Sequence, residues 1–326
     1  MKLKRVTAVL LAGVMAMGLV ACGSGSDTAA DTTTSTSTAT DTADDSESSD
    51  LLGSADATIH LKVGTTTAPD GHYVLGLVEM QKKLEEYSNG EMTLDIYPNS
   101  ALGGESDMMD AVSMGTQDMV LSSTGPIPDF SSATDNWATL DLPYLFETAE
   151  DAYKVLDGEI GQSLLDEFQG SGIKAIGFWE NGFRELTNNT KEVATPADLA
   201  GMKIRTMENA VHMATYTALG ATPTAMAWGE IFSALQQGTV DGQENPLAII
   251  LTAKVYEVQK YITMIDLFYS PCVLMINEDI YNNFTDEQKE AFDKAAEEKL
   301  QSVRSLRSLL PLHVQPWKLK VLYSLM

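Results

Sequence analysis

Residues 59–64 read IHLKVG, and they open the segment that decides the fold. Apolar and polar residues alternate along this run and a glycine ends it, which predicts a half-buried strand. Apolar residues then recur at helical spacing between residues 77 and 87, a second strand is predicted at 92–97, and a short helix precedes a third strand at 118–122. This β-α-β-α-β order predicts a parallel or mixed α/β sheet with helices on its faces.

The rest of the chain continues the α/β pattern. Further strands are predicted at 173–179, 202–207 and 272–276, and helices near 149–170, 208–219, 229–237 and 247–260. A final helix is expected from Thr285, because Thr285 and Gln288 form a Thr-x-x-Gln capping box. We expect two α/β lobes joined by crossover segments: residues 59–180 plus 271–300 form lobe I and residues 181–270 form lobe II.

Composition and charge exclude several classes of protein. The chain has 326 residues, and 21 Lys and Arg against 46 Asp and Glu give a formal net charge of −25. Such an acidic chain lacks the basic surface expected of a nucleic-acid-binding protein or of a protein held to anionic lipid by basic residues. Its two cysteines cannot build a disulfide framework or a cysteine-based zinc site.

The first 22 residues predict export. Three positively charged residues precede an apolar run, residues 6–20, that is too short to span a bilayer. The sequence Leu19-Val20-Ala21-Cys22 that follows resembles a bacterial lipobox. Residues 1–22 are therefore interpreted as a lipoprotein signal peptide with lipidated Cys22, the alternative being a plain signal peptide in which Cys22 has no role.

Two further segments differ in composition from the globular part. Residues 23–58 contain eight acidic residues, no Lys or Arg and many Ser and Thr, which predicts a disordered acidic tether. Residues 301–326 contain no acidic residue and four basic ones, and prolines interrupt the helical pattern. This tail is atypical: we favour a shifted reading frame or a damaged terminus, and a basic anchor is the alternative.

Signatures of catalysis are missing from the sequence. No nucleophile elbow, zinc-protease motif, phosphate-binding loop or dinucleotide-binding motif is present. The four histidines are scattered, so we expect no metal site, no cofactor and no catalytic residue. Cys272 lies beside an apolar run and is expected to be a buried thiol that packs as a small hydrophobe.

Two arginines stand out in this acidic chain. Arg184 and Arg205 are the only arginines between residues 179 and 245, and Arg205 lies at the end of a predicted strand, where open α/β sheets bind ligands. A guanidinium forms a planar two-bond fork with a carboxylate and stays charged at every relevant pH. The residues alone leave two readings open, which are a carboxylate clamp and an ordinary salt bridge to one of the many acids.

Five sequence blocks resolve this alternative by resemblance. They are Asp141-Leu142-Pro143-Tyr144-Leu145-Phe146, Glu180-Asn181-Gly182-Phe183-Arg184, Ala200-Gly201-Met202-Lys203-Ile204-Arg205, Leu219-Gly220-Ala221-Thr222-Pro223 and residues 234–246, ALQQGTVDGQENP. In this order they resemble the DctP family of solute-binding proteins, which serve tripartite ATP-independent periplasmic (TRAP) transporters. The resemblance extends from about residue 59 to about residue 299. It implies a periplasmic-binding-protein-like fold with two lobes and a ligand cleft between them.

The resemblance also implies a set of ligand-binding residues. Arg205 is assigned the principal fork to the ligand carboxylate, Arg184 assists it, and Asn245 orients the same group. Glu105 is expected to face polar groups on the rest of the ligand. The predicted wall residues are His72, Phe183 and Trp228. Glu244 and Asp241 are interpreted as mainly structural, and a leucine, Leu267, stands where the family pattern suggests a histidine.

The predicted function is that of an extracytoplasmic receptor, lipid-anchored at the outer face of the bacterial cell membrane. It captures an organic acid and delivers it to the membrane subunits of a TRAP transporter, and nucleic acid is not an expected partner. Two alternatives remain open: a secreted α/β enzyme that acts on acidic metabolites, and a ligand-sensing receptor component. The sequence does not distinguish C4-dicarboxylates, hexuronates or other sugar acids, and keto acids as ligands.

Overall fold

The structure is a computed structural model that describes the backbone of residues 51–309 and the side chains of residues 51–298. The predicted signal peptide 1–22 with Cys22, most of the predicted tether 23–58 and the tail beyond residue 309 lie outside the described residues. Residues 51–58, which were expected in the tether, contact the folded part, since the Ile96 amide donates to the Leu51 carbonyl at 2.8 Å. The folded part therefore begins before residue 59.

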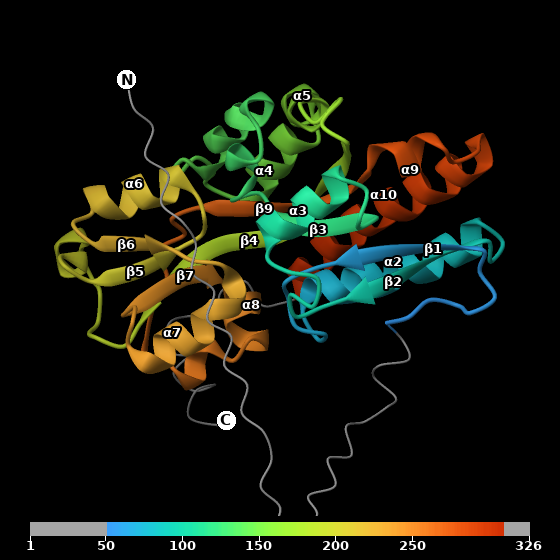
Figure 1. The fold of residues 1–326 in the computed structure, drawn as a ribbon. Helices are drawn as coiled ribbons and strands as arrows, with labels where there is room; N and C mark the ends of the chain where they lie inside the picture. Colours follow the sequence, from blue (N-terminus) through green and yellow to red (C-terminus); the bar gives the residue numbers. More distant parts are fainter. Residues whose placement is uncertain (1–50, 310–326) are drawn as a thin grey trace, which may run out of the picture. The chain divides into compact units, whose positions relative to one another are not determined.

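Strands and helices alternate along the chain (Figure 1). The strands are β1 (Ile59–Gly64), β2 (Met92–Tyr97), β3 (Met119–Ser123), β4 (Ile173–Asn188), β5 (Lys203–Thr206), β6 (Thr222–Ala225), β7 (Gly242–Pro246), β8 (Tyr261–Thr263) and β9 (Tyr269–Asn277). The α-helices are α2 (His72–Tyr87), α3 (Glu105–Ser113), α4 (Ala149–Leu156), α5 (Glu159–Asp166), α6 (Ala210–Ala218), α7 (Ile231–Gln237), α8 (Leu247–Thr252), α9 (Glu278–Asn282) and α10 (Asp286–Leu309). Short 3₁₀ helices are η1 (Ile127–Asp129), η2 (Ser132–Asp141), η3 (Pro196–Leu199), η4 (Trp228–Glu230) and η5 (Val255–Glu257). The expected mixed α/β class is confirmed.

One continuous sheet connects these strands in the order β2-β1-β3-β9-β4-β7-β5-β6, with β8 paired to β4. Strands β1, β2 and β3 are mutually parallel, and so are β5, β6 and β7. The long strands β4 and β9 are antiparallel to each other and connect the two parallel groups across the middle of Figure 1. The carboxyl ends of both parallel groups are thus available to build a ligand site.

Strand β4 changes partners halfway along its length. Residues 173–183 pair with β9, with irregularities on either side of residues 177–179, whereas residues 184–188 pair with β7. Gly182 has a φ of +125°, a backbone conformation that favours glycine, and it lies two residues before Arg184, where the pairing with β7 begins. The change of partners falls close to the expected lobe boundary at residues 180 and 181, and the lobe boundaries themselves stay a prediction.

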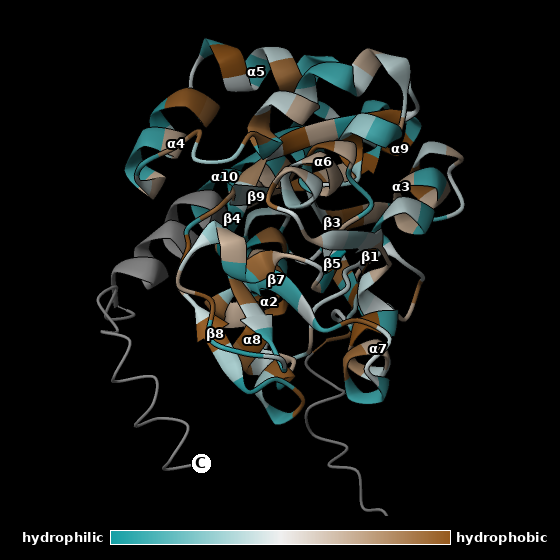
Figure 2. Cartoon of the chain, turned by 90° about the vertical axis from the view of Figure 1, so that its left-hand side faces the viewer, coloured by the Kyte–Doolittle hydropathy of each residue, from teal (hydrophilic) through white to brown (hydrophobic). Residues whose placement is uncertain are grey.

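The core follows from the two-residue period of the strands. On β9, Cys272, Leu274 and Ile276 pack with helices α2 and α10 on one face, while Val273 and Met275 pack with α3, α4 and α5 on the other. Figure 2 shows hydrophobic and hydrophilic segments alternating along helices such as α4 and α5, as expected of helices that cover a sheet. Cys272 is buried as predicted, and burial raises the pKa of its thiol well above the usual value.

Several predicted elements needed correction. The single helix expected near residues 149–170 is two helices, α4 and α5, because the chain turns at Gly158 and Gly161 then packs against the end of α4. The strand expected at 173–179 extends to Asn188, and strands β6, β7 and β8 were not predicted.

The capping box is confirmed, since the Thr285 amide donates to Gln288 Oε1 at 2.9 Å and the Gln288 amide to Thr285 Oγ1 at 3.2 Å. Among residues 51–309, no helix combines the length and apolarity that crossing a membrane requires.

Candidate functional site

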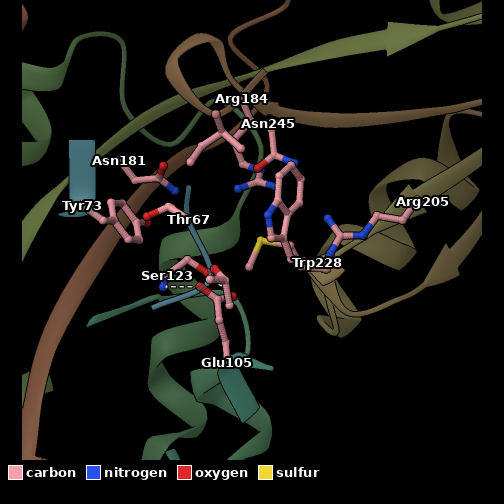
Figure 3. A pocket seen from close by; sticks show the side chains of 12 residues that line it. Thr67, Tyr73, Glu105, Ser123, Asn181, Arg184, Arg205, Trp228 and Asn245 are labelled. Carbon is pink, nitrogen blue, oxygen red and sulfur yellow. Dashed lines mark hydrogen bonds between the residues drawn. The ribbon is translucent and has the colours of Figure 1, made fainter. Parts of the chain in front are cut away.

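A small cavity lies where the carboxyl ends of the two parallel strand groups meet. Its volume is about 30 Å³, and segments from both groups contribute to its wall. The lining residues are Thr66, Thr67, Tyr73, Glu105, Ser123, Asn181, Arg184, Arg205, Met207, Trp228, Asn245 and Ile249. Five of the seven ligand-binding residues expected from the sequence are therefore together at one place, namely Arg184, Arg205, Asn245, Glu105 and Trp228 (Figure 3).

Arg184 is already paired within the protein. It is 1% exposed, and its Nε and Nη2 donate to both carboxylate oxygens of Glu244, while Nη2 also donates to the Glu244 carbonyl at 2.8 Å. Arg184 and Glu244 are diagonal neighbours on strands β4 and β7, because Arg184 pairs with Pro246. Burial alone would lower the pKa of Arg184, but the adjacent carboxylate outweighs it and the pKa is raised. Only Nη1 remains to assist a ligand.

Arg205 differs, because no carboxylate of residues 51–298 forms an ion pair with it. It is 3% exposed, and Nε and Nη2 donate to the Met226 carbonyl at 2.8 and 2.5 Å. No acidic side chain of the described residues lies within ion-pair distance of it. Burial, and next the positive charge of Arg184, lower the pKa of Arg205 to about 10, so the group stays charged at neutral pH. Arg205 is thus a buried cation whose remaining N–H groups are available to an anion.

Asn245 is oriented by a short hydrogen-bond chain on β7. Its Nδ2 donates to Gln243 Oε1 at 2.6 Å, and Gln243 Nε2 in turn donates to Thr187 Oγ1 at 2.9 Å on the adjacent strand β4. This chain fixes the amide plane and leaves a second Asn245 N–H for a ligand. The arrangement suits the predicted role of Asn245.

Glu105 occupies the opposite side of the cavity, at the start of α3. One oxygen of its carboxyl group accepts the Ser123 amide at 2.8 Å, and the other accepts the Ser123 hydroxyl at 2.8 Å (Figure 3). These bonds hold the carboxyl group at the carboxyl end of β3, and each oxygen keeps a lone pair. Glu105 can therefore accept hydrogen bonds from hydroxyl groups of a ligand.

The three predicted wall residues have different surroundings. Trp228 lines the cavity, with its ring centroid 6.0 Å from Arg205 Cζ. His72 and Phe183 are not among the lining residues: His72 contacts Tyr73 edge to face, and Phe183 packs against Tyr269 with ring centroids 5.2 Å apart. Burial lowers the pKa of His72 to about 4. Their assignment as wall residues stays a prediction.

A buried polar network behind Arg184 was missed by sequence reasoning. His212 on α6 lies between two acids, with Nε2 3.3 Å from Asp141 Oδ1 and Nδ1 3.7 Å from Glu244 Oε1. Asn209 caps α6 and donates to Asp141 Oδ2 at 2.7 Å and to the Gly125 carbonyl at 2.8 Å. Asp141 and Glu244 both belong to the conspicuous sequence blocks, which was the available signal.

The same network bears on the missing histidine. Leu267 is 2% exposed and joins the apolar cluster of this region. The next residue, Phe268, stacks on His212 with ring centroids 4.0 Å apart and planes 14° apart. The imidazole of His212 on α6 therefore lies beside Glu244, although residue 267 is a leucine and not a histidine.

The described residues offer no evident metal centre. No group of three or more His, Cys, Asp or Glu side chains among residues 51–298 is arranged to hold a metal ion. The polar groups in the cavity wall are instead guanidinium, amide, hydroxyl and carboxyl groups. Such a set can bind a carboxylate and hydroxyl groups through hydrogen bonds.

Comparisons with known proteins identify the family of this chain. A family described as "bacterial extracellular solute-binding protein, family 7" (DctP) matches residues 63–308. A solute-binding protein of Verminephrobacter eiseniae is 42% identical over 74% of this chain and 72% of its own. The 2,3-diketo-L-gulonate-binding periplasmic protein of Escherichia coli is 34% identical over 75% of this chain and 74% of its own.

A solved structure shows the same fold. It is the TRAP periplasmic solute-binding protein of Polaromonas with bound D-erythronate, which is 41% identical, covers 76% of this chain and 80% of its own, and superimposes with a TM-score of 0.73. The family match spans most of the described residues. This chain belongs to the DctP family of extracytoplasmic solute-binding proteins that serve TRAP transporters.

Proposed function

We propose that this chain captures an organic acid through its carboxylate and delivers it, chemically unchanged, to the membrane subunits of a TRAP transporter. The observation that supports this most is the state of Arg205, a buried guanidinium with two N–H groups on the Met226 carbonyl and no acid of the described residues beside it. A buried charge without a partner is unfavourable, so the site is favourable only when an anion joins it. The ligands named for two relatives, D-erythronate and 2,3-diketo-L-gulonate, are organic acids.

The electrostatics of the cavity support carboxylate binding despite the negative charge of the chain. Long-range repulsion by the net charge of −25 is screened beyond about 8–10 Å at physiological salt. At contact, charge-assisted hydrogen bonds from Arg205, Nη1 of Arg184 and Asn245 contribute about 1.5–3 kcal/mol each where water is excluded. Local attraction therefore outweighs the distant repulsion.

The test is a thermal-shift screen of the mature protein against a panel of organic acids, followed by calorimetry. A ligand present at 100 times its dissociation constant adds about 2.7 kcal/mol of stability, which is a readily measured shift. We expect at least one acid to bind wild type and to lose most of its affinity to Arg205→Lys. No stabilisation by any carboxylate, or turnover of the bound acid in mass spectrometry, would contradict the proposed function.

We also propose that the protein is anchored by a lipid on Cys22. The support is the lipobox-like Leu19-Val20-Ala21-Cys22 and the following acidic segment, which would let the folded part reach its membrane partners. Cells that express the full chain should incorporate labelled palmitate into it, and Cys22→Ser should abolish both the label and the recovery of the protein in the membrane fraction. Retention of Cys22→Ser in the membrane fraction would argue against this anchor.

A further inference from the structure

The Tyr144 turn, residues 142–145, is an exposed apolar segment between η2 and α4. Its three large apolar side chains, Leu142, Tyr144 and Leu145, are 44%, 67% and 40% exposed. Single exposed apolar residues are ordinary on a protein surface, whereas three within one turn form a patch of the kind that contacts a partner.

The backbone of the turn is unfavourable for the residue at its tip. The Leu145 amide donates to the Leu142 carbonyl at 3.3 Å, so Pro143 and Tyr144 are the two central residues of a β-turn. Tyr144 has a φ of 56°, and a positive φ at this position favours glycine and is costly for a bulky aromatic residue. Because the side chain is largely exposed, packing does not require a tyrosine here. Such an outlier at an exposed residue points to a role in function.

The turn is held rigidly from both sides. Before it, the carboxyl group of Asp141 is buried and accepts a hydrogen bond from Asn209 Nδ2 at 2.7 Å. After it, Phe146 is buried and packs edge to face against an aromatic side chain of β9. The Tyr144 amide itself donates to the Leu267 carbonyl at 2.9 Å. The exposed side chains are therefore presented on a fixed backbone, which lowers the ordering cost of binding a partner.

The surface around the Tyr144 turn is strongly acidic. Residues 129–167 form η1, η2, α4 and α5, which pack on the same side of the sheet. They contain ten acidic residues and one lysine, and Asp141 is the one buried acid of this range. The lysine, Lys154, pairs with Asp151 at 2.9 Å. Glu147 and Glu150 are exposed directly after the turn. The apolar patch thus lies in a negative field.

This charge decides which kind of partner fits the patch. An anionic lipid surface would repel it. A second copy of this chain, bound symmetrically through the same turn, would bring two acidic surfaces together, which is also unfavourable. The complementary partner is a protein with an apolar pocket for an aromatic side chain and with Lys or Arg around that pocket.

We propose that the Tyr144 turn is a docking surface for the membrane subunits of the transporter. Tyr144 enters an apolar pocket on their extracytoplasmic side, and Glu147 and Glu150 face basic residues around it. This inference rests on the proposed function and adds where the partner binds. No residue of the turn lines the Arg205 cavity, so docking and ligand binding depend on different side chains.

Tyr144→Gly separates docking from folding. Glycine suits the positive φ, so the stability of the variant in denaturant should equal or exceed that of wild type. Its affinity for the best acid in calorimetry should change less than twofold, because Tyr144 does not line the cavity. Its affinity for the membrane subunits, reconstituted in nanodiscs and measured with the acid present, should fall at least 10-fold, as expected of an aromatic anchor. The matched control is Ile160→Ser on α5, a 61% exposed apolar residue of the same acidic surface, which should leave this affinity within twofold of wild type.

A charge reversal tests the acidic rim. Glu147→Lys should slow association with the nanodiscs at least fivefold at low salt, and the difference should shrink as salt is added. The control is Glu290→Lys, which makes the same change of charge at an exposed position of α10. Helix α10 packs in the apolar cluster on the other side of the sheet, so its association rate should stay within twofold of wild type.

Uptake of the acid into proteoliposomes that contain the membrane subunits separates this inference from the proposed function. If wild type drives uptake and Tyr144→Gly does so with the same half-saturating protein concentration, the inference is wrong and the proposed function stands. A loss of stability or of acid affinity in Tyr144→Gly would show a structural role and would also overturn it. So would a wild-type dimer in sedimentation that Tyr144→Gly dissociates, because the turn would then bind a second copy. If wild type neither binds an acid nor drives uptake, both proposals fail.

Discussion

Arg205→Lys keeps the positive charge of the site and removes the planar fork. In the structure, Nε and Nη2 of Arg205 are fixed by the Met226 carbonyl, so the remaining N–H groups face the cavity in one geometry. A lysine has a single flexible ammonium group, which can make one of the two bonds to a carboxylate and no longer holds the Met226 carbonyl in the same way. The expected loss is therefore that of one charge-assisted bond.

The size of this loss follows from burial. Arg205 is 3% exposed, so water does not replace the missing bond, and the loss of about 1.5–3 kcal/mol is expected in full. This corresponds to a dissociation constant about 10- to 150-fold higher. At an exposed site, the same change would cost about 1 kcal/mol or less.

Isothermal calorimetry at fixed ionic strength measures this effect, with the best acid from the ligand screen. The control is Lys203→Met, which removes an exposed positive charge two residues away on β5 and should change the affinity less than twofold. An Arg205→Lys affinity within threefold of wild type would refute the argument that a fork at this position holds the ligand.

Three further predictions concern stability in the absence of ligand. Arg184→Met should destabilise the protein by about 3–5 kcal/mol, because it leaves the Glu244 carboxylate buried without its guanidinium partner. Arg205→Met should leave stability unchanged or raise it, because it removes a buried charge that no acid of the described residues pairs with. Equal losses of stability in denaturant unfolding would contradict this difference. Burial, and next the nearby Asp266 carboxylate, raise the pKa of Glu185 from 4.5 to about 8, so the stability that its bound proton gives is present below pH 4.5 and lost as the pH rises toward 8. Glu185→Gln should flatten a slope of at most about 1.4 kcal/mol per pH unit, measured between pH 6.5 and 8. His72, whose pKa falls from 6.5 to about 4 on folding, contributes equally to wild type and variant and cancels in the comparison. An unchanged slope would count against the prediction. Asn209→Ala should cost about 2 kcal/mol, since it removes the cap of α6 and a bond to the buried Asp141, and a loss below about 0.5 kcal/mol in the same unfolding assay would show that the cap contributes little.

The sequence predicted the fold where local pattern and tertiary packing agree. Alternation identified β1, and helical spacing identified α2, because each buries one regular face in the core. Strand β7 was not predicted, since its residues Gly242–Pro246 are polar and such residues are uncommon in strands. They are tolerated there because Gln243 bonds to Thr187 and Glu244 to Arg184 across the sheet, while Asn245 bonds to Gln243 on the same strand.

The sequence predicted several of the residues that form the site, but not which of the two arginines is paired with a carboxylate. Strand ends and sequence blocks indicated Arg205, Arg184 and Asn245, and all three line the cavity. Glu244 neutralises Arg184, whereas Arg205 has no such partner among the described residues. This difference depends on a pairing across 60 residues of chain, which no local pattern reports. The position of His212 between two distant acids has the same cause.

The account depends most on where the carboxylate of the ligand lies. A crystal structure of the mature protein with its best acid measures this directly. We predict that both carboxylate oxygens lie within about 3 Å of Arg205 guanidinium nitrogens, while the Arg184–Glu244 pair remains intact. A carboxylate bound to Arg184 with Glu244 displaced, or one bound outside the cavity, would contradict it.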